Sequence, residues 1–190
     1  MKTHWNYFLA LEADLEVCSR YVDFSADNFN VFSIEFAKIL QASSSEIDVV
    51  AKILCKKIAS GERRRNIDDY RNVILSKYSK FSEVELKIER YCLNFTPWSE
   101  WKNGNNPSWW KSYNNVKHER DRYFSEASLE NVLNSMAGLM CILLYCFSLE
   151  TNSNSNEISL PKGTKLFEPK WYGFGEPASI SALYSIPKEP

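Results

Sequence analysis

The chain has 190 residues, of which 44% are apolar and 14% aromatic, and its formal net charge is −1. This length suits one domain with one sizeable core, and the near-zero charge excludes a strong long-range attraction to nucleic acid or to an anionic membrane. We therefore expect one globular domain in which any polyanion binding depends on a local group of basic residues.

The first half of the chain carries apolar residues three and four positions apart, the spacing of amphipathic helices. The capping-box pattern of Ser43 and Glu46 predicts a helix start, Gly61 predicts a helix end, and Asn66 is expected to cap a further helix. Four helices are therefore expected here: Trp5 to Val22, Val31 to Gln41, Ser43 to Ile58, and one that follows Asn66 and includes Ile74.

The middle of the chain predicts a small extended arm. Residues 84–88 and 91–95 alternate apolar and polar, and the parity slips at Glu89 and Arg90. This pattern fits either one bulged strand or two short strands. A long loop is then expected from Pro97 to Pro107.

Two helices and a tail are expected in the last part of the chain. One runs from about Trp109 to Tyr123 with Ser108 as its cap, and the other covers about residues 125–149. The apolar run at residues 136–147 is too short for a bilayer core of about 30 Å, so it predicts a buried core helix. Residues 151–190 are expected to form a loop and an extended tail packed on a helical domain of residues 1–150.

The predicted fold is mainly α, a helical bundle of about five or six helices with a small extended arm. Its core is predicted from helical spacing in the third and last helices. The predicted core residues are Ile47, Val50, Leu54, Ile58, Val132, Leu133, Met136, Met140, Leu143 and Leu144.

The five cysteines include no CxxC pair, and three of them lie in apolar helical patterns. They are interpreted as buried, reduced thiols of a cytoplasmic protein. His4 and His118 are the two histidines, too few for a His-rich metal site. The acidic N-terminal segment does not resemble a signal peptide. We therefore expect no metal, no cofactor and no membrane partner.

The helix at residues 109–123 carries the candidate chemical site. Asn114 and His118 lie four residues apart, and therefore one turn apart on one face. A histidine held by an amide is suited to act as a general acid or base. Lys117, Arg120 and Arg122 add positive charge for a phosphate, although a helical wheel places Arg120 nearly opposite His118. The alternative is an ordinary surface histidine among solubilising charges.

A second group of basic residues lies between the third and fourth predicted helices. Such a group can follow a phosphate backbone. It is equally well interpreted as a solvated charge run that nearby acidic residues balance. Its members are Lys56, Lys57, Arg63, Arg64, Arg65 and Arg71.

Asn114, His118 and the helix around them resemble the motif helix of HEPN-type domains. These domains are small all-α bundles, and many are metal-independent ribonucleases of bacterial defence and toxin systems. Their motif is an arginine, often followed by asparagine, with a histidine four to six residues further on. Here Tyr113 stands where the family has the arginine, and a tyrosine cannot replace a guanidinium on a phosphate.

The resemblance implies a cytoplasmic HEPN-like protein of a defence or toxin system that binds RNA or acts on it as a homodimer. His118 would be the general acid or base and Asn114 its orienting partner. Phosphate contacts would come from Lys117, Arg120 and Arg122, and from the basic residues Arg63, Arg64 and Arg65. Because the motif arginine is absent, the other hypothesis is a catalytically inactive helical module that binds a protein partner.

Overall fold

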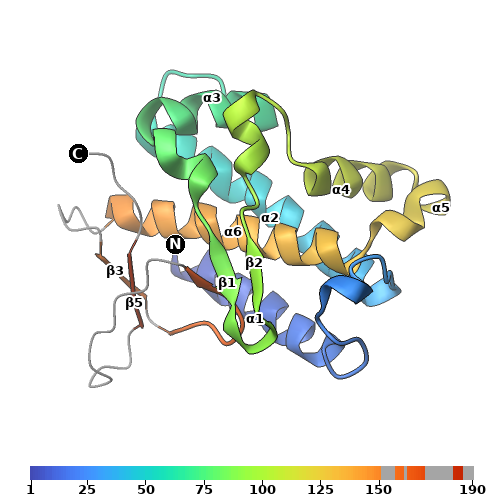
Figure 1. The fold of residues 1–190 in the computed structure, drawn as a ribbon. Helices are drawn as coiled ribbons and strands as arrows, with labels where there is room; N and C mark the ends of the chain where they lie inside the picture. Colours follow the sequence, from blue (N-terminus) through green and yellow to red (C-terminus); the bar gives the residue numbers. More distant parts are fainter. Residues whose placement is uncertain (151–156, 161, 170–181, 186–190) are drawn as a thin grey trace.

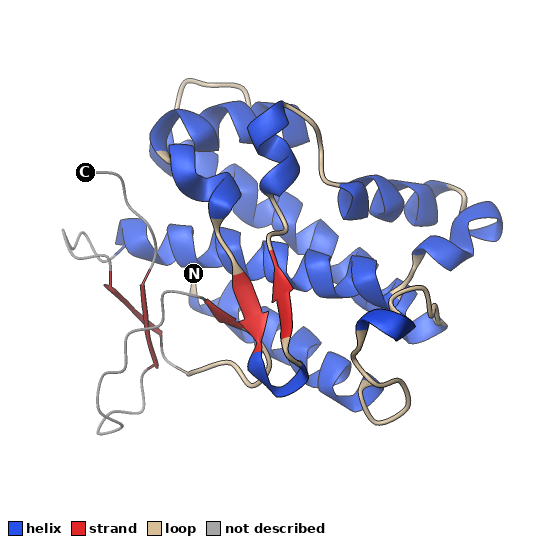
Figure 2. Cartoon of the chain, viewed as in Figure 1, coloured by secondary structure: helices blue, strands red, loops and turns tan. Residues whose placement is uncertain are grey.

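A computed structural model describes residues 1–150, 157–160, 162–169 and 182–185 (Figure 1). In these residues the chain forms a mainly α bundle with short strands at one side, as predicted (Figure 2). The α-helices are α1 Lys2–Cys18, α2 Ile34–Ile58, α3 Ile67–Lys77, α4 Ser108–His118, α5 Arg120–Tyr123 and α6 Leu129–Glu150. The strands are β1 Leu86–Ile88, β2 Leu93–Phe95, β3 Glu157–Leu160, β4 Glu168–Pro169 and β5 Ala182–Ser185.

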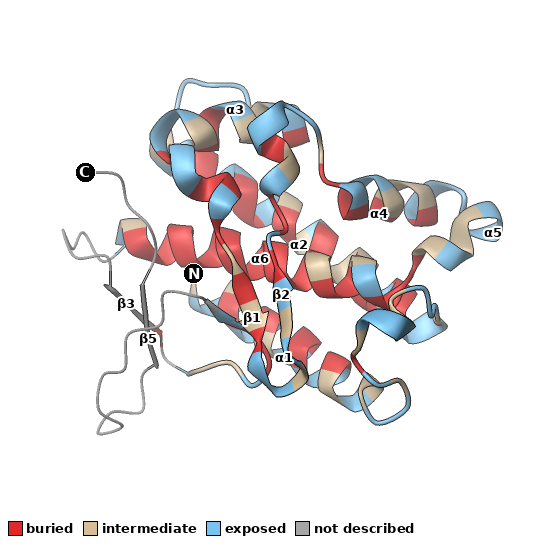
Figure 3. Cartoon of the chain, viewed as in Figure 1, coloured by how far each residue is buried: buried red, intermediate tan, exposed pale blue. Residues whose placement is uncertain are grey.

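Helix α6 runs through the middle of the bundle and packs against α1, α2 and α4 (Figures 1 and 3). Every residue from Ser135 to Ser148 is buried, so α6 has no solvent-facing side along this stretch. By length and composition α6 would pass for a membrane-spanning helix, but 89% of its most apolar window is buried inside the protein. The burial agrees with the predicted core helix.

The predicted core is confirmed for all ten residues except Ile58, which is only partly buried at the end of α2. Aromatic rings fill much of the remaining interior. Phe81, Trp98 and Trp101 stack or tilt against one another with centroids 4.3–5.8 Å apart. Large rings of this kind bury extensive apolar area and so stabilise a single packed core.

The predicted helix boundary at Ser43 is wrong, because α2 is one continuous helix. It is capped by Ser33, whose hydroxyl accepts the N–H of Phe36 at 3.1 Å. Ser43 is buried inside the helix, where its Oγ lies 2.8 Å from the Oγ of Ser135 on α6. This hydrogen bond satisfies the Ser43 hydroxyl inside the core, so the side chain does not cap a helix end. The Asn66 cap is confirmed, since its side chain accepts the N–H of Asp69 at 2.9 Å.

The single helix predicted from Trp109 to Tyr123 is also interrupted. Helix α4 ends at His118, and Glu119 leaves helical geometry at φ −137° and ψ 53° before α5 begins. The side chain of Asn115 donates to the carboxylate of Glu126 at 2.9 Å, which ties the returning chain to α4. Ser108 is the first residue of α4 rather than its cap, and its N–H donates to Oε1 of Glu100 at 2.8 Å.

The extended arm is a hairpin of two short strands, the second of the two predicted alternatives. In β1 and β2, Leu86 pairs with Phe95 and Ile88 with Leu93. Cys92 has a positive φ of 52° at the turn between them. Strand β4, from the predicted tail, pairs with the other edge of β1, so the strand order is β2-β1-β4.

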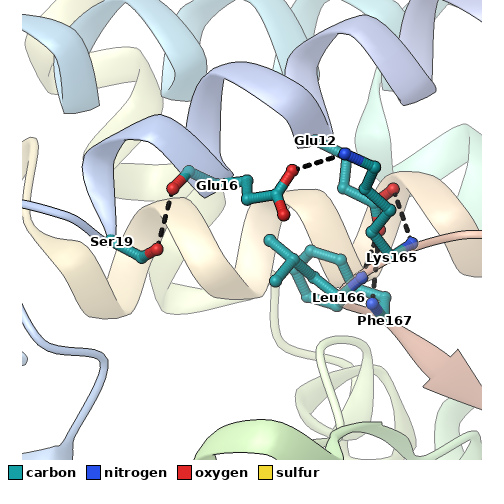
Figure 4. A network of polar contacts seen from close by, with 6 residues as sticks. All are labelled: Glu12, Glu16, Ser19, Lys165, Leu166 and Phe167. Atoms are coloured by element: carbon teal, nitrogen blue, oxygen red, sulfur yellow. Dashed lines mark hydrogen bonds and ion pairs between the residues drawn. The ribbon is translucent and has the colours of Figure 1, made fainter.

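A buried carboxylate links α1 to residues 165–167 (Figure 4). Glu12 is 1% exposed and accepts the backbone N–H groups of Lys165 at 3.0 Å, Leu166 at 2.9 Å and Phe167 at 3.3 Å. Burial raises the pKa of Glu12, although these three N–H groups act to lower it. Beside it, Nζ of Lys165 donates to Glu16 at 2.8 Å. We call this arrangement the Glu12 clasp.

Candidate functional site

His118 is the last residue of α4, and its side chain is exposed. Within the described residues it makes no hydrogen bond or ion pair. Asn114 is one turn earlier, as predicted, but its Nδ2 donates to the carbonyl of Trp110 in the same helix at 3.0 Å. The amide is therefore committed to its own backbone and does not orient the imidazole.

The basic residues near His118 are divided by the helix break. Lys117 belongs to α4, and its Nζ lies 5.5 Å from the centroid of the Tyr113 ring. Arg120 and Arg122 lie beyond Glu119, where the wheel drawn for one unbroken helix does not apply. Arg122 lies 3.7 Å from the carboxylate of Glu119, and Arg120 is exposed.

Lys117 and Tyr113 line an open groove of about 450 Å³ between α1, α2 and α4. Its charged lining residues are Lys38 and Lys117, and no acidic side chain lines it. Tyr7 of α1 is 41% exposed there, so its ring is accessible. We call this surface the α1–α2–α4 groove; it is lined by Tyr7, Lys38, Gln41, Ala42, Ser45, Tyr113 and Lys117.

Sequence reasoning missed Tyr7 and Lys38. They lie on two helices far from residue 117, and nothing in their local spacing marks them as neighbours of the motif helix. Lys38 is largely exposed and donates to the carboxylate of Glu35 at 2.8 Å. That hydrogen bond raises the pKa of Lys38, so its ammonium stays charged at neutral pH.

The basic group between α2 and α3 is mostly paired within the protein. The guanidinium of Arg64 donates to the carbonyls of Ser60 and Glu62 at 2.9 and 3.2 Å. Arg65 lies 3.8 Å from Asp69. Lys57 and Arg71 are also paired with carboxylates, at 3.0 Å each.

Two members of this group differ from the rest. Arg63 and Lys56 are exposed and have no side-chain partner among the described residues. Because most of these basic side chains are paired within the protein, the group is better interpreted as a balanced charge run than as a binding surface for a phosphate backbone. Only Lys56 and Arg63 are left unpaired and available to solvent among its described members.

The cysteines do not form a chemical site of their own. All five are free, and Cys55, Cys141 and Cys146 are buried. Burial raises the pKa of Cys55 and of Cys146 to about 12, which leaves these thiols protonated and unreactive. In the described residues, no group of three or more His, Cys, Asp or Glu side chains could hold a metal ion.

Comparison with protein-family models, with curated proteins and with solved structures finds no match to this chain. The α1–α2–α4 groove combines two ammonium groups with the exposed Tyr7 ring and has no acidic lining residue. That combination suits a ligand that carries negative charge and a flat aromatic group.

Proposed function

We propose that this chain is a HEPN-like protein that binds single-stranded RNA in the α1–α2–α4 groove. The observation that carries the proposal is that Lys38 and Lys117 line one groove with an accessible tyrosine and no acidic lining residue. The carboxylate of Glu35, which pairs with Lys38 at 2.8 Å, is not among the lining residues. Lysines attract backbone phosphates, and an exposed ring such as that of Tyr7 can stack on a base. The net charge of −1 makes such a local arrangement necessary.

The binding test measures the anisotropy of a labelled single-stranded RNA at several salt concentrations. Lys38→Gln combined with Lys117→Gln should weaken binding and reduce the salt slope by about 1.4, since each phosphate contact contributes about 0.7 on a single strand. Lys56→Gln combined with Arg63→Gln removes the same charge from two exposed side chains outside the groove. If this control weakens binding more, or the unmodified chain binds no RNA at low salt, the groove proposal is wrong.

RNA cleavage is the second part of the proposal, and it requires a homodimer. Metal-independent cleavage needs a proton shuttle and a cation that stabilises the developing charge. In one chain His118 is not held by a partner among the described residues, and Arg120 lies beyond the helix break. A second chain would supply the missing charge and hold His118 in place.

The cleavage test incubates the purified chain with single-stranded and transfer RNAs in the presence of a chelator. His118→Ala should lower cleavage by about 10²–10⁴-fold and leave RNA binding in the groove intact. Light scattering at micromolar concentration should show a dimer. A monomer, or equal cleavage by His118→Ala, would exclude this mechanism and leave RNA binding as the function.

A protein-interaction module is the second candidate function, and a separate surface favours it. The connection between α1 and the start of α2 exposes Tyr21 by 84%, Phe32 by 47% and Ile34 by 70%. Phe32 and Ile34 are separated by a single residue, and exposed apolar side chains close together are typical of a partner-binding surface. Co-purification with the products of neighbouring genes tests it, because Ile34→Glu should abolish an association that Lys117→Gln leaves unchanged.

A further inference from the structure

A second pocket, of about 260 Å³, lies between the end of β2 and the starts of α4 and α6. Rings of Phe95 and Trp109, both nearly buried, form part of its wall. It is more enclosed than the α1–α2–α4 groove and shares no residue with it. Its chemistry can therefore be assessed independently of RNA binding.

The charged residues that line this pocket are both acidic. Glu130 is exposed, and its carboxylate makes no hydrogen bond or ion pair with any described residue. Glu100 accepts the N–H of Ser108 through Oε1, and its other oxygen has no described partner. No lysine, arginine or histidine lines the pocket. Two negative charges thus face a partly apolar space without an internal counter-ion.

Two of the three asparagines in the pocket wall donate a side-chain hydrogen bond within the protein. Nδ2 of Asn131 donates to the carbonyl of Glu126 at 2.9 Å, and Nδ2 of Asn134 donates to that of Glu130 at 3.0 Å. The side-chain oxygens of both asparagines remain as acceptors. Asn131 and Asn134 therefore offer acceptors to a ligand that donates hydrogen bonds, while the amide of the exposed Asn94 can donate or accept.

The start of α6 does not provide an anion site either. Exposed N–H groups at a helix N-terminus ordinarily attract negative charge. Here the N–H of Leu129 donates to the carbonyl of Val31 at 2.8 Å, and that of Glu130 donates to the carbonyl of Phe29 at 3.2 Å. With these backbone donors occupied, the carboxylate of Glu130 dominates the local charge.

We propose that this pocket binds a small organic cation that carries a primary ammonium or guanidinium group. Its charge would be neutralised by Glu100 and Glu130, and its N–H groups would donate to the free oxygens of Asn131 and Asn134. The two carboxylates favour a cation over a neutral donor, because no basic residue lines the pocket. The volume lies just below the range of about 300–1,000 Å³ for drug-sized ligands, so the cation is small.

Calorimetric titration of the full chain with agmatine, which carries both a guanidinium and an ammonium group, tests the proposal. Saturable binding is expected, with no binding of succinate or glucose at the same concentrations. Glu130→Gln should weaken agmatine binding at least about tenfold, the effect of losing one charged hydrogen bond. Because the Glu130 side chain has no described partner, this variant should keep the native melting temperature.

Glu62→Gln is the matched control, since it removes one negative charge from the exposed connection between α2 and α3. Agmatine affinity should be unchanged in this variant. Equal weakening by Glu62→Gln would show that agmatine responds to overall charge alone, and tighter binding of glucose would show a polyol site. Either result, or no saturable agmatine binding at millimolar concentration, overturns the proposal. RNA binding is measured separately and remains informative in every case.

Discussion

Glu12→Ala tests whether the Glu12 clasp holds residues 165–167 on the bundle. It removes three backbone hydrogen bonds of 2.9–3.3 Å. A hydrogen bond to a charged acceptor contributes about 1.5–3 kcal/mol to the stability of the folded chain. Desolvation offsets part of this, because burial raises the pKa of Glu12. We expect the free energy of unfolding to fall by about 3–5 kcal/mol, because three buried N–H groups lose their acceptor at about 1–3 kcal/mol each and the desolvation of Glu12 offsets part of the loss.

Urea unfolding followed by circular dichroism measures this loss, and hydrogen exchange locates it. The amides of Leu166 and Phe167 should exchange much faster in Glu12→Ala, because their acceptor is gone. Glu16→Ala is the matched control on the same helix. Its partner is the exposed Nζ of Lys165, and surface ion pairs contribute little to stability. Equal urea midpoints for the two variants, or unchanged protection at Leu166 and Phe167, would refute the reasoning.

A pH series tests the ionisation of Glu12. Since burial raises its pKa from 4.5, the folded chain should lose stability relative to Glu12→Gln as pH rises from about 4.5 through the raised pKa; a relative gain would contradict this. Gly138→Ala should lower the free energy of unfolding by up to about 2 kcal/mol, because the new Cβ would lie 3.1 Å from the Trp109 ring and this overpacking outweighs the gain of about 1 kcal/mol that alanine brings to a helix. Calorimetry would contradict this by showing an unchanged or higher Tm. Cys92 is the one exposed thiol of the five, so a thiol reagent should label it fastest in the native chain. Cys18 is half-buried and burial raises its pKa, so it should react more slowly, and fast labelling of three or more sites would show that the core opens.

Much of the helical architecture could be predicted because it depends on local chemistry. The spacing of apolar residues marks the buried faces of α1 and α2, and a continuous apolar run marks α6. Asn66 caps α3 with a side chain that lies three residues from its partner. The error at Ser43 has a different origin. Its hydroxyl meets Ser135, 92 residues away, and no local pattern distinguishes that contact from a cap.

The candidate site was less predictable for the same reason. The pairing of Asn114 with Trp110 is a backbone contact that competes with the expected contact to His118. No glycine or proline stands at Glu119 to predict the helix break. The hydrogen bond from Asn115 to Glu126 holds the chain after the break against α4. Tyr7, Lys38 and Lys117 meet only because three helices pack together.

The central position of α6 has a consequence for how the chain is made. The helices that bury their apolar faces against α6, namely α1, α2 and α4, all precede it in the chain. When residues 1–128 have emerged from the ribosome, α1, α2 and α4 still lack α6, the helix on which they pack. Nascent chains with exposed apolar faces aggregate or recruit chaperones. Chaperone binding to this chain should therefore persist through most of its synthesis and end abruptly once residues 129–150 emerge.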